Sequence, residues 1–163
     1  MNRDSYDTAQ VCLNGHAIIS SYHDYPQFRK EHCPQCGEPT ITECPNCETE
    51  IQGSYRDDMG MGRPYHPPNY CHNCGKPFPW TVRTLDVARE LAEEFDELNE
   101  TEKDQLKESL EDLIKTTPRT PLAQKRFKKI MAKVGRESYE AMKGILTDIV
   151  SETIRKVIFG RDI

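Results

Sequence analysis

The sequence predicts a small, metal-stapled α+β protein in which tandem zinc ribbons, built of short β-hairpins, precede an all-α tail of about four helices. Three observations predict this class. All seven cysteines and all five histidines precede residue 75, the cysteines include three Cys-x2-Cys pairs, and residues after 80 show helical periodicity. We therefore expect a double zinc-ribbon domain over residues 1–80 and a helical bundle or oligomerisation domain over residues 81–163.

Composition limits the classes of protein. A chain of 163 residues with 36% hydrophobic and 30% charged residues forms one or two lightly packed domains. The start, MNRDSYDTAQ, is polar where a secretory signal needs an apolar run, so we expect a cytoplasmic protein. No membrane span is expected, because charges interrupt the most apolar segment, residues 145–159. The net charge of -5 disfavours general nucleic-acid binding.

The cysteines are expected to bind metal. An odd number of cysteines without an export signal argues against a disulfide framework. The three Cys-x2-Cys pairs supply six ligands, whereas two tetrahedral zinc sites need eight. Cys12 and His16, which lie on one turn in CLNGH, supply the other two. The predicted ligands of two zinc ions are Cys12, His16, Cys33, Cys36, Cys44, Cys47, Cys71 and Cys74.

The order of the pairs favours a sequential grouping. The first site then combines Cys12 and His16 with Cys33 and Cys36, and the second combines the remaining two pairs. An interleaved grouping stays open, although it would bury the short connection GEPTITE. The other histidines, which adjoin ligand cysteines or lie in loops, are expected to face solvent: His23, His32, His66 and His72.

The turns that carry the ligands are called knuckles below. Gly37 and Gly75 follow two of the Cys-x2-Cys pairs and suit the left-handed backbone of such turns. Glu48 takes this place in the middle pair, so a looser turn is expected there. HAIISSY and the residues around Ile51 and Tyr55 are predicted hairpin strands.

The strands have too few apolar residues to fold alone. Zinc would stabilise each site by roughly 10 to 16 kcal/mol, so its removal is expected to unfold this half of the chain. Four protein ligands per site leave no position for water or substrate, and we therefore expect no enzyme. A metal-dependent hydrolase would need an open coordination position.

The cysteine motifs resemble known sequences. CLNGH followed by HCPQCG resembles the zinc-ribbon pattern common in prokaryotic proteins. ECPNC followed by YCHNCGKPFPW resembles an uncharacterised bacterial zinc-ribbon family, in which a double ribbon precedes a helical tail. The resemblance covers residues 11–80. It implies the metal ligands but indicates no substrate.

Between the last two knuckles runs the loop YRDDMGMGRPYHPPNY, residues 55–70. Its glycines and prolines exclude regular structure. Tyr65 and His66 are candidate partner-binding residues, because loops held by a rigid scaffold often carry such contacts. The alternative is a linker that packs its tyrosines on its own ribbon.

Four helices are predicted in the tail. Their expected ranges begin near Thr84, at Thr101, at Thr120 and near Glu137, and the last runs to about Phe159. Its apolar face is unusually broad, and we expect it to support a homo-oligomer. The face comprises Tyr139, Met142, Ile145, Leu146, Ile149, Val150, Ile154, Val157 and Ile158.

Charge is divided along the tail. Residues 81–118 contain 5 basic and 12 acidic residues, and residues 119–163 contain 11 and 5. Either the two halves neutralise each other within the bundle, or a basic segment forms a patch for phosphate or an acidic protein. This segment comprises Lys125, Arg126, Lys128 and Lys129.

The leading functional hypothesis is a non-enzymatic adaptor that has two structural zinc ions and binds another protein. The alternative is a nucleic-acid-binding zinc-ribbon protein that uses the basic segment. The segment lacks interleaved aromatic residues, which single-stranded nucleic acids use for stacking, so the adaptor is preferred.

Overall fold

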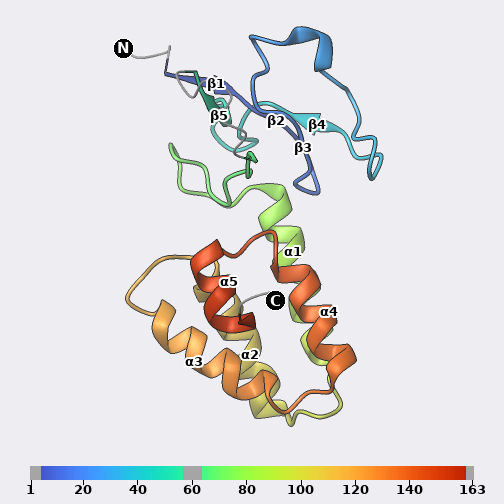
Figure 1. Cartoon of the computed structure of the whole chain (residues 1–163), viewed down its shortest axis with the longest axis vertical. Helices are drawn as coiled ribbons and strands as arrows, with labels where there is room; N and C mark the ends of the chain where they lie inside the picture. Colours follow the sequence, from blue (N-terminus) through green and yellow to red (C-terminus); the bar gives the residue numbers. More distant parts are fainter. Residues whose placement is uncertain (1–4, 57–63, 161–163) are drawn as a thin grey trace. The chain divides into compact units, whose positions relative to one another are not determined.

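The computed structural model describes residues 5–56 and 64–160 of the chain (Figure 1). The chain divides into two compact units, Met1–Val82 and Arg83–Ile163. Within the described residues, the first unit holds two small antiparallel sheets, and five α-helices follow. The α+β class with small antiparallel sheets is therefore confirmed.

One sheet has three strands in the order β3-β2-β4 (Figure 1). They are β2 (Gln10–Cys12), β3 (Ala17–Ile19) and β4 (Thr40–Ile41). The buried Val11 at the centre pairs with Ala17 on one side and Ile41 on the other. β3 lies within the predicted HAIISSY strand, whereas β4 lies within GEPTITE, which was expected to be only a connection.

The other sheet joins strands far apart in the sequence. β1 (Tyr6–Thr8) pairs with β5 (Gln52–Tyr55), and Tyr6 lies opposite Tyr55. Gly53 permits this pairing, because a Cβ atom there would lie 2.2 Å from the backbone oxygen of Ser20. The expectation of two separate hairpin ribbons in tandem is wrong in this respect, since this second sheet is not a hairpin.

The core of the first unit includes cysteines of one ligand group. Phe78 and Trp80 stack with ring centroids 4.6 Å apart. The two rings pack in one cluster with buried apolar side chains and two cysteines. The partly buried Tyr65 packs against this cluster. The buried members are Ala9, Val11, Cys44, Ile51, Cys71, Phe78 and Trp80.

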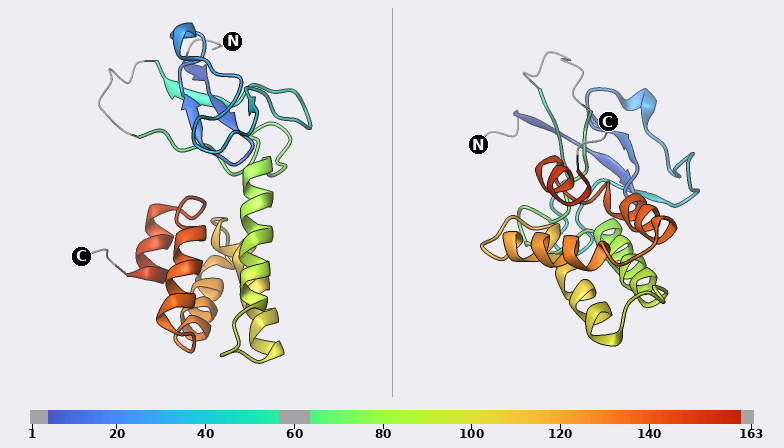
Figure 2. Two further views of the ribbon diagram at one scale, coloured as in Figure 1. Left: turned by 90° about the vertical axis from the view of Figure 1, so that its right-hand side faces the viewer. Right: turned by 60° about the horizontal axis from the view of Figure 1, so that its bottom comes forward.

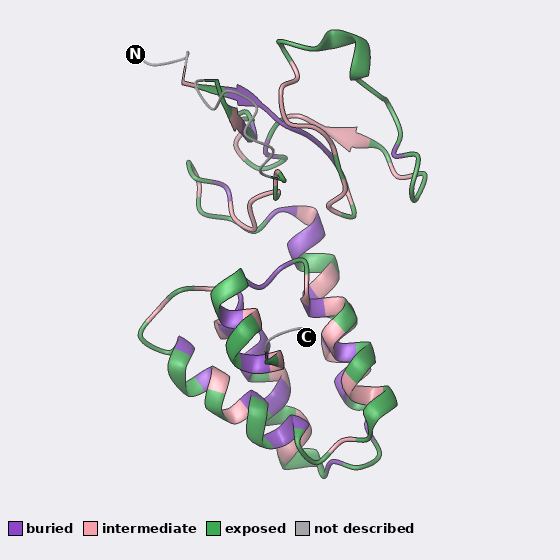
Figure 3. Ribbon diagram, viewed as in Figure 1, coloured by how far each residue is buried: buried purple, intermediate pink, exposed green. Residues whose placement is uncertain are grey.

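Figure 2 shows the helices in two further views. Each helix buries one face, as the periodicity predicts (Figure 3). Their bounds are α1 (Pro79–Glu93), α2 (Glu100–Leu113), α3 (Thr120–Met131), α4 (Arg136–Leu146) and α5 (Glu152–Phe159). α1 begins at Pro79 and not near Thr84, because proline is well suited to a first turn. Asn99 and Glu102 form a capping box at the start of α2.

The predicted last helix is two helices. The backbone leaves α4 at Leu146, and Ser151 caps α5 by accepting a hydrogen bond from the Ile154 amide at 3.2 Å. The break allows Ile149 and Val150 to be buried as well. Of the nine residues in the predicted apolar face, Val157 is the most exposed, at 41%. Six of the nine residues are thus buried inside the unit, and the expected homo-oligomer stays a prediction.

The described helices differ from membrane-spanning helices in length and apolar character. A spanning helix needs about 20 predominantly apolar residues. None of the helices in residues 5–56 and 64–160 has the length and apolar character to cross a membrane.

Candidate metal centres

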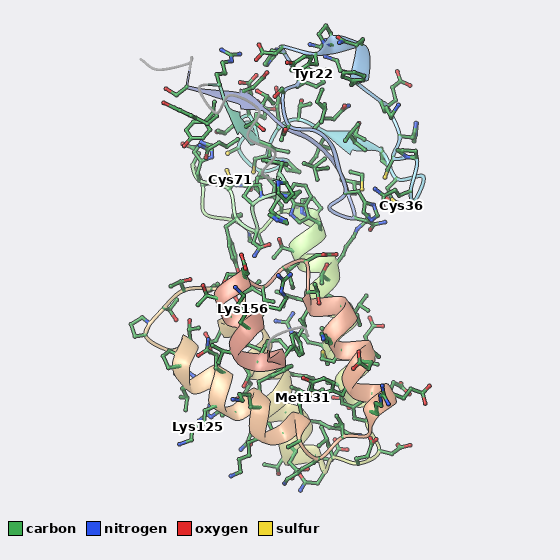
Figure 4. The ribbon with its side chains drawn as sticks, viewed as in Figure 1. Tyr22, Cys36, Cys71, Lys125, Met131 and Lys156 are labelled. Carbon is green, nitrogen blue, oxygen red and sulfur yellow. The ribbon has the colours of Figure 1, made fainter. Side chains whose placement is uncertain are left out.

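The structure brings the eight predicted ligands together in two groups. The first cluster contains Cys12, His16, Cys33 and Cys36, and the second contains Cys44, Cys47, Cys71 and Cys74. Within each cluster, all four ligand atoms lie within 4.8 Å of one another. The grouping is the sequential one. Figure 4 labels one cysteine of each cluster, Cys36 and Cys71.

The distances suit zinc. Tetrahedral zinc with bonds of about 2.3 Å to sulfur separates two sulfurs by about 3.8 Å, whereas a disulfide bond measures about 2.05 Å. The Sγ atoms of Cys12 and Cys36 lie 3.7 Å apart. In the second cluster, Cys44 to Cys74 spans 3.7 Å and Cys47 to Cys71 spans 3.6 Å. Each cluster could therefore bind one zinc ion, and none of its cysteines is in a disulfide.

His16 fits the fourth position of the first cluster. With zinc bonds of about 2.0 Å to nitrogen and about 2.3 Å to sulfur, a ring nitrogen and a sulfur lie about 3.5 Å apart. The Nδ1 atom of His16 is 3.4 Å from the sulfur of Cys12 and 3.5 Å from that of Cys33. Nδ1 is therefore the nitrogen that faces the three sulfurs.

Three knuckles share one backbone turn. In the knuckle of Cys33, the amide of Gly37 donates to the carbonyl of Cys33, and the amide of Cys33 donates to the carbonyl of Glu38, both at 2.8 Å. The same two bonds occur in the other two knuckles. The amide of Glu48 donates to the carbonyl of Cys44, and the amide of Gly75 donates to that of Cys71. The amides of Cys44 and Cys71 donate to the carbonyls of the residues five positions later.

The turn of the middle knuckle is not looser than the others. Glu48 has a φ of 63°, close to the 79° of Gly37 and the 74° of Gly75. A non-glycine residue thus adopts the left-handed backbone that the turn requires. The metal-ligand geometry prevails here over the local preference of glutamate.

The knuckle of Cys12 is one residue longer. Gly15 has a φ of 90° and donates its amide to the carbonyl of Cys12 at 2.9 Å. A Cβ atom on Gly15 would lie 2.9 Å from the Cβ of Trp80. Glycine therefore serves both the turn and the close approach of the core tryptophan. The amide of His16 donates to the Cys12 sulfur at 3.3 Å.

Asparagine side chains link the knuckles of each cluster. Asn46 is hydrogen bonded to the sulfur of Cys74, and Asn73 is hydrogen bonded to that of Cys47. Asn14 makes the corresponding bond to Cys36 in the first cluster. Such outer partners orient metal ligands and tune their basicity. These asparagines were not predicted as site residues, although their position one or two residues before the second ligand of a knuckle was a usable signal.

The Cys33 knuckle differs from the other three in a way that supports the place of His16 in the first cluster. Gln35 stands where the other knuckles have asparagine, and the ligand opposite it is an imidazole, not a thiolate. Within the described part of the chain, the Gln35 side chain makes no hydrogen bond to His16. Asparagine is therefore replaced by glutamine where the ligand of the opposite knuckle is a nitrogen and not a sulfur.

The cysteines of the metal-free protein differ in acidity. The backbone amide of Glu38 lowers the pKa of Cys36 to about 6. The hydroxyl of Thr49, 3.2 Å from the Cys47 sulfur, lowers the pKa of Cys47 to about 6. Burial raises the pKa of Cys44 to about 11. Cys36 and Cys47 are therefore mostly thiolates at neutral pH in the metal-free protein, whereas Cys44 is protonated and must lose its proton when metal binds.

The clusters differ in their surroundings. All four cysteines of the second cluster belong to or pack against the core of the first unit. The first cluster contributes no residue to that core cluster, and Cys36 is exposed. A metal ion in the second cluster would therefore be continuous with this hydrophobic core, whereas one in the first cluster would lie outside it, beside the exposed Cys36.

The remaining histidines are exposed, whereas Tyr65 is half-buried. The hydroxyl of Tyr65 donates to the carbonyl of Gln52 at 2.5 Å, and burial raises the pKa of Tyr65. These contacts support the interpretation that the loop packs its tyrosine on its own ribbon. His66 is exposed, as are His23, His32 and His72. Residues 57–63 of the predicted partner-binding loop lie outside the described residues.

The basic segment lies on the outer side of α3. Lys125, Lys128 and Lys129 are exposed and Arg126 is half-buried; Lys125 extends outward in Figure 4. Ion pairs join the acidic and basic halves of the tail elsewhere, from Arg119 to Asp112 at 3.1 Å and from Lys133 to Glu102.

The segment itself takes no part in that neutralisation. In the portion of the chain that the structure describes, none of its four residues forms an ion pair. The expected neutralisation within the bundle therefore does not extend to these four cations.

Comparison with known proteins places this geometry in a family. A family model described as "Uncharacterized protein conserved in bacteria (DUF2321)" matches residues 5–158, nearly the whole chain. No curated protein sequence and no solved structure matches the chain.

Proposed function

We propose that this chain, which belongs to the DUF2321 family of bacterial proteins, is a zinc-binding, non-enzymatic adaptor whose two metal ions are structural. The family membership agrees with the resemblance seen in the cysteine motifs. The observation that carries the proposal is the ligand count, because each cluster gathers four protein ligand atoms within 4.8 Å.

A full ligand set supports a structural role. Catalytic zinc keeps a position for water or substrate, and four protein ligands around a tetrahedral ion fill every position. The hydrogen bonds from backbone amides and from Asn14, Asn46 and Asn73 further fix the sulfurs. The free thiols suit a reducing compartment, which supports the proposed cytoplasmic location.

X-ray absorption at the zinc edge tests the structural role. The two sites should give an average of 3.5 sulfur and 0.5 nitrogen ligands per ion, because one set is three cysteines with a histidine and the other is four cysteines. A light-atom contribution above this average that is replaced by additional sulfur scattering when a thiolate inhibitor is added would reveal an exchangeable position. That result would favour a hydrolase and contradict the proposal.

The adaptor role predicts a polypeptide partner. The tagged, zinc-loaded chain should retain the same identified protein from the native bacterium with and without nuclease treatment. Loss of that protein after nuclease treatment would contradict a direct protein contact. The overall charge of -5 supports this preference over nucleic acid.

One observation favours nucleic acid as a second candidate, namely the exposed cations of the basic segment. Filter binding at increasing salt concentration separates the candidates. The adaptor predicts no affinity for nucleic acid at physiological salt. The alternative predicts binding that falls steeply with salt and is lost when Lys125, Arg126, Lys128 and Lys129 are changed to Glu.

A further inference from the structure

We propose that residues 22–30, here called the aromatic loop, contact the partner, and that the partner presents an apolar pocket bordered by carboxylates. The inference rests on the proposed adaptor function and names the surface that performs it. The loop lies between β3 and Cys33, inside the first cluster's ligand set, and neither the clusters nor the basic segment involves it.

The loop exposes large aromatic side chains. Phe28 is 56% exposed and Tyr25 is 50% exposed, and their ring centroids lie 6.2 Å apart. Both belong to or adjoin the 3-10 helix η1 (Pro26–Phe28), which is coloured as exposed in Figure 3. Exposed apolar residues side by side are typical of interaction sites, whereas single ones are common on any surface.

Buried polar side chains hold both ends of this exposed loop. Asp7, only 3% exposed, accepts hydrogen bonds from the amides of His23 at 3.1 Å and Asp24 at 3.0 Å. Gln10, 6% exposed, donates to the Lys30 carbonyl at 2.7 Å and accepts from the Lys30 amide at 3.1 Å. The loop is thereby fixed before any partner arrives, which lowers the entropic cost of binding.

Arg29, near the end of the loop, contacts Tyr22 at its start. The Nε atom of Arg29 donates to the carbonyl of Tyr22 at 2.9 Å. Its guanidinium lies 3.9 Å from the centre of the Tyr22 ring (Tyr22 is labelled in Figure 4). This contact covers one face of Tyr22, and Tyr25 and Phe28 remain the outward-facing rings.

The charges of the aromatic loop indicate which residues should border the partner's pocket. Asp24 is paired with Arg56 at 3.6 Å, which leaves the positive charges of the loop uncompensated. Among the described residues, neither Arg29 nor Lys30 forms an ion pair with a carboxylate. Two cations beside two exposed rings complement an apolar pocket with an acidic rim, and Tyr and Arg are frequent hot-spot residues.

A polypeptide suits this surface better than nucleic acid does. Carboxylates crowd the rest of the first unit and would repel phosphates. Among the residues that the structure describes, the exposed ones outside the loop are Glu31, Glu43, Glu48 and Glu50. An acidic rim on a protein can meet Arg29 and Lys30 alone, because it does not extend as a continuous polyanion.

Photocrosslinking in the native bacterium tests the assignment. A benzophenone amino acid replaces Tyr25 or Phe28 in the full chain, and Val87, 49% exposed on α1, provides the control position. We expect both loop positions, and not position 87, to crosslink one and the same protein, identified by mass spectrometry. Adducts sensitive to nuclease, or crosslinks equal to the control, would overturn the inference.

Affinity for the identified protein completes the test. With purified components, Phe28→Ala and Arg29→Glu should each raise the Kd at least about tenfold, and Val87→Ala should leave it unchanged. Equal zinc content and equal melting temperature in all variants would show that folding is intact. If the partner binds wild type and both loop variants equally, the inference fails while the adaptor function stands. If no protein partner is recovered at all, both fail.

Discussion

The side chain of Asn73 is hydrogen bonded to the sulfur of Cys47 across the second cluster. This bond crosses from one knuckle to the other and stabilises the thiolate that zinc requires. Asn73→Ala should therefore lower the zinc affinity of the second cluster by about 10- to 100-fold, measured by competition with a chelator. Gln35→Ala is the matched control, because Gln35 takes the corresponding position in the Cys33 knuckle and is exposed, and it should leave both affinities unchanged. Equal losses in the two variants would contradict the role of the amide.

Glu48 stores strain in the second cluster. Its φ of 63° costs a non-glycine residue about 1 kcal/mol, so Glu48→Gly should raise the zinc affinity of this cluster about fivefold. Gly75→Ala should lower it by a similar factor, because no atom lies within 4 Å of the added Cβ and only the backbone is strained. A fall in affinity after Glu48→Gly would show that the turn is not limited by φ.

Gly53 is required where β5 passes close to other backbone segments. An added Cβ would lie 2.2 Å from the Ser20 oxygen and 2.8 Å from the Asp7 oxygen. Gly53→Ala should therefore destabilise the first unit by at least about 2 kcal/mol, as measured by the fluorescence of Trp80 during denaturation. Gly144→Ala, in open space on α4, should leave that transition unchanged. A normal transition in Gly53→Ala would contradict the pairing of β1 with β5.

Asp7 should make the first unit sensitive to acid. Burial raises the pKa of Asp7, but the amides of Thr8, His23 and Asp24 and the charge of Arg56 outweigh it and hold the pKa below 3.8. Stability from a lowered pKa is present above the ordinary value and is lost as pH falls through the folded value.

Comparing Asp7→Asn with wild type separates the effect of this carboxylate from that of the metal ligands, which also respond to acid. At pH 7, Asp7→Asn should be less stable than wild type by about 1 to 3 kcal/mol, and the difference should shrink below pH 4. Glu43→Gln, an exposed site in the same unit, should match wild type throughout. A difference that stays constant with pH would exclude ionisation of Asp7 as its source.

Local signals predicted most of the candidate site. A Cys-x2-Cys pair places two sulfurs on one turn, so the spacing alone identified six ligands, and CLNGH supplied the other two. The pairing of Tyr6 with Tyr55 could not be predicted, because it joins strands that no local turn connects. The loop contacts of Asp7 and Gln10 have the same non-local origin.

The ends of the helices were harder to predict from the sequence than their buried faces. Phe127 and Leu110 are buried as their spacing predicts, since the period of 3.6 is a property of the whole segment. The break before α5 depends on one cap, Ser151, within an otherwise continuous apolar pattern. Ser151 followed by Glu152 was the available signal for it.

The metal content of the purified chain tests the central claim most directly. Elemental analysis under reducing conditions should give two zinc ions per polypeptide for wild type and for His72→Ala, and one for Cys71→Ser, because Cys71 faces the second cluster whereas His72 is exposed. His16→Ala should weaken the first site alone. One zinc ion or none in the wild-type protein, or equal losses in Cys71→Ser and His72→Ala, would contradict the two-site account.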